Sequence, residues 1–84
     1  MEQFDPSTSF QNLKAFLLLR RVTLADIARK HGFVPLMFQQ MARAYWGTDR
    51  QPRAIQMDKM LRALREEIAV MRGAADEPRA AAGE

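Results

Sequence analysis

The side chains in this sequence that are best suited to chemistry are amides and guanidinium groups. Gln39, Gln40 and Arg43 lie close together, and Arg50 and Arg53 follow shortly after them. A glutamine amide can form two hydrogen bonds with the edge of adenine, and an arginine can bind guanine or a phosphate. These residue types favour binding to a nucleic acid over a catalytic reaction.

The chain contains few residues that could catalyse a reaction or bind a metal ion. Its 84 residues include one histidine, no cysteine and scattered carboxylates. Thiolate ligands are therefore absent, and no nucleophile with a matching base can be assembled. We interpret His31 as a packed or helix-terminal residue. The sequence predicts that the protein is not an enzyme and has no metal site, cofactor or small-molecule substrate.

The charge of the chain is unevenly distributed. The formal net charge is +3, but residues 73–84 hold three carboxylates and one arginine, so residues 1–72 carry +5. A compact basic domain indicates an anionic partner, and nucleic acid is the usual one. An ordinary basic domain without such a partner remains the alternative on charge alone.

Length and hydropathy indicate one small domain. The chain has no apolar run long enough to span a membrane, and its first residues lack the basic and apolar regions of a secretory signal. The absence of cysteine suits a reducing compartment. We expect a cytoplasmic protein, in the bacterial cytoplasm or nucleoid, with no membrane partner.

Two helices joined by a tight turn are predicted between residues 23 and 43. Thr23 can cap the first helix, with Asp26 in a capping-box position. Gly32 supplies the positive φ that ends this helix, and Pro35 suits the first position of the next. Helical spacing predicts these inward-facing residues: Leu24, Ile27, Ala28, His31, Phe38, Met41 and Ala42.

The same stretch carries a family resemblance. Ala28 is followed four residues later by Gly32, with Ile27, Phe33, Phe38 and Met41 apolar around them. This pattern resembles the helix-turn-helix of lambda-repressor-like regulators, in which a small residue permits close helix crossing. The leading helix, the glycine turn and the basic loop before a last helix are also similar to the small Ner-type regulators of Mu-like phages. The resemblance implies an all-α fold of four to five helices with a long C-terminal helix.

The resemblance also implies a function and a site. Such proteins are DNA-binding transcriptional regulators, and the second helix of the motif, expected here at 35–45, enters the major groove of double-stranded DNA. The loop behind it binds phosphates, which supply much of the affinity. Carried over to this sequence, the DNA-binding residues would be Leu36, Gln39, Gln40, Arg43, Thr48, Arg50 and Arg53.

One departure from the family pattern supports a second hypothesis. The first outward positions of the reading helix are usually polar in these regulators, but this chain has Val34, Pro35, Leu36 and Met37 there. Apolar side chains can contact a thymine methyl group but cannot read hydrogen-bond donors and acceptors. The alternative function is a helical protein–protein interaction module that uses the helix-turn-helix shape without DNA.

A first helix is predicted at about 9–20, capped by Asp5 or Ser9, and a long helix at 53–72. Tyr45 and Trp46 between them are interpreted as packing residues. The long helix carries two sets of apolar residues, one of which includes Met60. The other set has heptad-like spacing, and we assign it to a homodimer interface: Met57, Leu61, Leu64, Ile68 and Met71. The alternative is a kink near Leu64 that folds the last turns onto the core of the same chain.

Composition divides the chain into three parts. Residues 1–8 are predicted to be a flexible N-terminal arm, 9–72 the helix-turn-helix domain, and 73–84 a disordered tail rich in alanine and charge.

Overall fold

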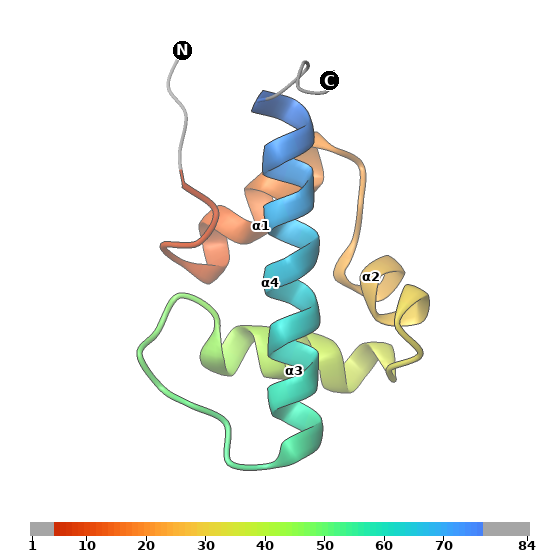
Figure 1. The fold of residues 1–84 in the computed structure, drawn as a ribbon, viewed down its shortest axis with the longest axis vertical. Helices are drawn as coiled ribbons and strands as arrows, with labels where there is room; N and C mark the ends of the chain where they lie inside the picture. Colours follow the sequence, from red (N-terminus) through yellow and green to blue (C-terminus); the bar gives the residue numbers. More distant parts are fainter. Residues whose placement is uncertain (1–4, 77–84) are drawn as a thin grey trace.

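A computed structural model describes residues 5–76, and this part of the chain is all-helical, with four α-helices and no β-strand (Figure 1). The helices are α1 (Phe10–Leu19), α2 (Leu24–Lys30), α3 (Pro35–Tyr45) and α4 (Ile55–Asp76). The predicted all-α class and the long last helix are confirmed. Within the described residues, no helix has both the length and the apolar character that a membrane crossing requires.

The helices begin where side chains satisfy their first free N–H groups. Asn12 N–H donates to Ser9 Oγ at 3.0 Å, so Ser9 rather than Asp5 caps α1. Thr23 and Asp26 form both bonds of a capping box at α2. Pro35 occupies the start of α3, where its missing N–H costs nothing.

The first two helices end in the same hydrogen-bonded turn. At α2, Phe33 N–H donates to the Ala28 carbonyl and Gly32 N–H to the Arg29 carbonyl, with Gly32 at φ +78°. At α1, Val22 N–H donates to the Leu17 carbonyl and Arg21 N–H to the Leu18 carbonyl, but the residue with positive φ is Arg21, at 58°. A non-glycine residue in this conformation is strained by about 1–2 kcal/mol. The packing of α1 therefore maintains Arg21 in a backbone conformation that an arginine does not favour.

The core lies where α4 crosses α1 and α3 (Figure 1). α4 runs the length of the molecule, and α2 flanks the end of α3 that follows the turn. The largest fully buried side chains come from α1, α3 and α4: Leu13, Phe38, Met41, Met60, Leu61 and Leu64.

The apolar stripe of α4 belongs to this core, which corrects its assignment to a dimer interface. Leu61, Leu64 and Ile68 are only 1%, 0% and 3% exposed within the single chain, and Met57 and Met71 pack against the same cluster. α4 is one continuous helix through Leu64, so the stripe reaches the core without the kink considered above. Heptad-like spacing identifies an apolar face but not the chain that covers it.

The ends of the described region differ from the predicted boundaries. Residues 5–8, predicted to be part of a flexible arm, form a hydrogen-bonded turn in which Pro6 is buried. Trp46 Nε1 donates to the Pro6 carbonyl at 2.7 Å, which fixes this turn to the end of α3. α4 continues past the predicted end at Arg72 to Asp76, because Gly73 alone does not stop a helix. Predictions for residues 1–4 and 77–84 lie outside the described residues.

Candidate nucleic-acid interface

Aromatic packing fixes the orientation of α3 relative to α2. The ring of Phe33 stacks between His31 and Phe38, with centroid distances of 6.2 and 5.8 Å. Phe38, Met41 and Ala42 are 0% exposed and form the inner face of α3. Because this face is completely buried, the opposite face of α3 is held towards solvent.

The exposed face of α3 carries four of the predicted site residues. Leu36, Gln39, Gln40 and Arg43 are all exposed, and their spacing of three, one and three residues places them on one side of the helix. The structure therefore brings the α3 residues together as the sequence predicted.

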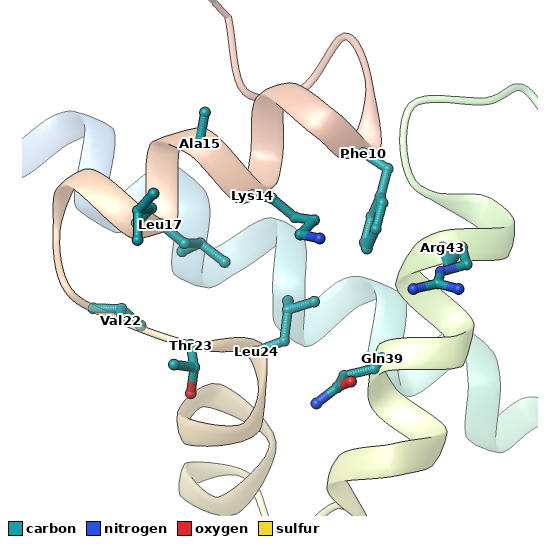
Figure 2. Close-up of a pocket in the computed structure, with 10 residues that line it drawn as sticks. Phe10, Lys14, Ala15, Leu17, Val22, Thr23, Leu24, Gln39 and Arg43 are labelled. Carbon is teal, nitrogen blue, oxygen red and sulfur yellow. The ribbon is translucent and has the colours of Figure 1, made fainter.

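A contact from α1 positions Arg43. Its guanidinium carbon lies 5.8 Å from the centre of the Phe10 ring, and Lys14 Nζ lies 5.7 Å from the same ring. Figure 2 shows Phe10 directed towards Arg43, with Lys14 on the same side of α1. A cation over an aromatic face is attracted by the ring electrons. Sequence reasoning missed Lys14, although its position four residues after Phe10 on α1 could have indicated the pair.

The loop between α3 and α4 is ordered by short local contacts. Thr48 Oγ1 donates to the Tyr45 carbonyl at 2.9 Å and accepts from Arg50 N–H at 3.1 Å. The Arg50 guanidinium carbon lies 5.2 Å from the centre of the Tyr45 ring. Thr48 was predicted to contact DNA, but its hydroxyl closes this turn. Arg50 and Arg53 are exposed and line one shallow recess with Tyr45.

The start of this loop is anchored to the N-terminal turn. Trp46 is 5% exposed, in agreement with its interpretation as a packing residue, and Tyr45 packs against the edge of the core. Gly47 has φ +76°, and a Cβ atom there would lie 2.7 Å from Ser9 Cα. The backbone of Gly47 thus touches the N-terminal cap of α1. This contact fixes the start of the loop that carries Arg50 and Arg53.

Ion pairing distinguishes two groups of cations among the described residues. Arg29, Lys30, Arg62 and Arg72 each lie within 4 Å of a carboxylate. Within residues 5–73, no carboxylate lies that close to the cations on or beside the proposed site, which are Lys14, Arg43, Arg50 and Arg53, and the same is true of four cations elsewhere on the chain: Arg20, Arg21, Lys59 and Arg65. The second group is therefore free of internal counter-charges in the described region and can neutralise an external anion.

The start of α3 is exposed and apolar. Val34, Leu36 and Met37 are 56%, 63% and 41% exposed. Three adjacent apolar side chains in solvent are typical of a surface that contacts another molecule. The geometry at this point is compatible with thymine methyl groups and with a protein partner.

A carboxylate behind the site joins α2 to α4. Lys30 Nζ and His31 Nε2 lie 3.0 and 2.9 Å from the same oxygen of Glu67, whose side chain is 14% exposed. The hydrogen bond from Lys30 holds the pKa of Glu67 below its usual value, with a further contribution from His31. His31 is the residue that ends α2, as interpreted from the sequence, and this contact adds a role that spacing did not reveal.

Comparison of the chain with models of protein families, with curated proteins and with solved structures found no match. The residues described above therefore carry the functional proposal.

Proposed function

We propose that the protein is a small DNA-binding transcriptional regulator of the repressor-like kind, in which α2 and α3 form the helix-turn-helix. The observation that carries this proposal is the exposed face of α3. Gln39, Gln40 and Arg43 project from a helix whose opposite face is 0% exposed, and arginines without internal ion pairs follow in the next loop.

In this proposal α3 lies in the major groove, where Gln39 and Gln40 contact base edges. Arg43, next to Phe10, reaches either a guanine or a phosphate at the rim of the groove. Arg50 and Arg53 bind phosphates and fix the register, because backbone contacts orient such proteins without reading sequence. Thr48 serves by shaping the turn that presents Arg50.

The salt dependence of binding tests the electrostatic part of this proposal. Affinity for duplex DNA should fall steeply between ~50 and ~200 mM salt, because each neutralised phosphate releases counterions. Arg50→Ala and Arg53→Ala should weaken binding to all sequences and should each reduce the logarithmic salt slope by about one.

Arg62→Ala is the matched control for these variants. Arg62 is exposed on α4 and already paired with Asp58 at 3.0 Å. Its removal should leave both the affinity and the slope nearly unchanged. If Arg62→Ala changes DNA binding as much as Arg50→Ala does, the loop is not the phosphate-binding surface.

The exposed apolar start of α3 favours a second candidate function, a protein–protein interaction module. Leu36→Ser and Met37→Ser would then abolish binding to a protein partner. The two functions are separated by titrating the protein with mixed duplex fragments at low salt. An absence of any binding there, with Trp46 fluorescence unchanged, would favour the interaction module over the DNA-binding regulator.

A further inference from the structure

A groove of about 380 Å³ opens between α1, the residues that link α1 to α2, and α3 (Figure 2). This volume is within the range of pockets that bind small molecules. Most of the lining is apolar, and the apolar side chains come from α1, the link and the first residue of α2: Phe10, Ala15, Leu17, Leu18, Val22 and Leu24.

The charged side chains that line the groove are Lys14 and Arg43. Figure 2 shows Phe10, Arg43 and Gln39 on one side of the groove and Leu17 and Val22 on the other. Lys14 and Arg43 lie on either side of the Phe10 ring in Figure 2, at 5.7 and 5.8 Å from its centre. Neither cation has a carboxylate within 4 Å among the described residues. The groove therefore combines an apolar channel with cations that lack an anion.

We propose that this groove binds a single-chain acyl carboxylate. The carboxylate would lie beside the ammonium group of Lys14, with which it can form a charge-assisted hydrogen bond. The acyl chain would lie along Leu18 and Val22 and remove their apolar surface from water. A ligand with only one of these two features would leave either the cations or the apolar wall without a partner.

Occupancy of the groove would also regulate the protein. Gln39 and Arg43 line the groove and belong to the proposed DNA-binding face, so the ligand and DNA should compete. This consequence rests on the proposed function, whereas binding of the carboxylate does not.

Calorimetric titration of the full chain with octanoate, hexanoate and 1-octanol tests the binding step. Octanoate should bind saturably with one site per chain, and about tenfold more tightly than 1-octanol, which lacks the charge. Each methylene between hexanoate and octanoate should add roughly two- to fourfold in affinity. Equal binding of octanoate and 1-octanol, or no saturable binding of octanoate, would overturn the proposal.

Adjacent residues of α1 provide matched variants for the apolar wall. Leu18 lines the groove and is 76% exposed, while Leu19 is 72% exposed and is not part of the lining. Neither side chain is in the core, so both variants should fold. Leu18→Ser should weaken octanoate binding about fivefold or more, and Leu19→Ser should not. Equal effects of the two substitutions would place the ligand elsewhere.

Lys14→Met and Lys59→Met test the charged part of the groove in the same way. Both lysines are exposed, but Lys59 lies on α4 outside the groove. Only Lys14→Met should reduce the preference for octanoate over 1-octanol. If inorganic phosphate or a duplex oligonucleotide binds through Lys14 while octanoate does not bind, the cations serve the nucleic-acid backbone and the acyl carboxylate proposal is wrong.

A competition experiment keeps the two proposals distinguishable. If octanoate binds and displaces duplex DNA, both are supported. If octanoate binds to a protein that has no affinity for DNA, the ligand site stands and the proposed function fails. If DNA binds and octanoate does not, the proposed function stands and the ligand site fails.

Discussion

Replacement of Gly47 by alanine tests the contact that anchors the arginine loop. Gly47 has φ +76°, and a Cβ atom there would lie 2.7 Å from Ser9 Cα and 3.0 Å from both Ser9 N and the Thr8 carbonyl oxygen. All three atoms belong to the backbone, so no side-chain rotation can relieve the overlap.

Gly32→Ala provides the matched comparison, because Gly32 has a similar φ of +78° but no atom within 4 Å of its added Cβ. An alanine in the left-handed region costs about 1–2 kcal/mol, and its lower entropy in the unfolded chain recovers about 0.4–1 kcal/mol. We expect Gly32→Ala to lower the free energy of unfolding by about 1 kcal/mol. At Gly47 the backbone must also move, which adds about 1–3 kcal/mol, for a total of about 2–4 kcal/mol.

Urea unfolding followed by circular dichroism measures both values, and the slope with denaturant should stay constant if only stability changes. For a domain of this size, each kcal/mol corresponds to about 4–8 °C in Tm. Equal losses for the two variants would show that Gly47 does not pack on Ser9, and the anchored loop would then be wrong.

Two further predictions concern α4. Leu64→Asp should destabilise the fold by about 4 kcal/mol or more, because Leu64 is 0% exposed in its own chain and a carboxylate there would be buried without a partner; Val70→Asp, at a position 67% exposed on the same helix, should change little. If Leu64→Asp were a monomer in sedimentation and had unchanged stability in urea unfolding, the apolar stripe of α4 would be a dimer interface and not part of the core. Glu67→Gln should cost about 1–2 kcal/mol at neutral pH, because it removes the ion pair with Lys30, whose contribution is weakened by the 66% exposure of the Lys30 side chain. The exposed Glu66→Gln is the control. Because the folded-state pKa of Glu67 is lowered from 4.5, this stabilisation is present above pH 4.5 and is lost as the pH falls through the folded value; a cost independent of pH would contradict the contact.

The boundaries of the helices could be predicted where the sequence contains local signals. Thr23 and Asp26 mark the start of α2, Gly32 marks its end, and Pro35 marks the start of α3, because each residue acts on backbone groups within one turn. Arg21 gave no such signal, since an arginine at positive φ is imposed by packing and not by its own preference.

Contacts between distant residues could not be predicted from spacing. Helical periodicity identified the apolar face of α4, but the same pattern suits a second copy of the chain or the chain's own core. The hydrogen bond between Trp46 and Pro6 joins residues forty positions apart, and the Glu67 contact joins α4 to the end of α2. Neither pair has a sequence signature, because both depend on how the helices cross.

The central claim is that the exposed face of α3 reads DNA sequence, and selection of bound duplexes from a random pool tests it most directly. The wild-type protein should enrich a common short site. Gln39→Ala or Gln40→Ala should change the preference at a single base pair by about 1–3 kcal/mol without altering the salt slope. A pool that shows no enrichment, or a site preference that both glutamine substitutions leave unchanged, would contradict the claim.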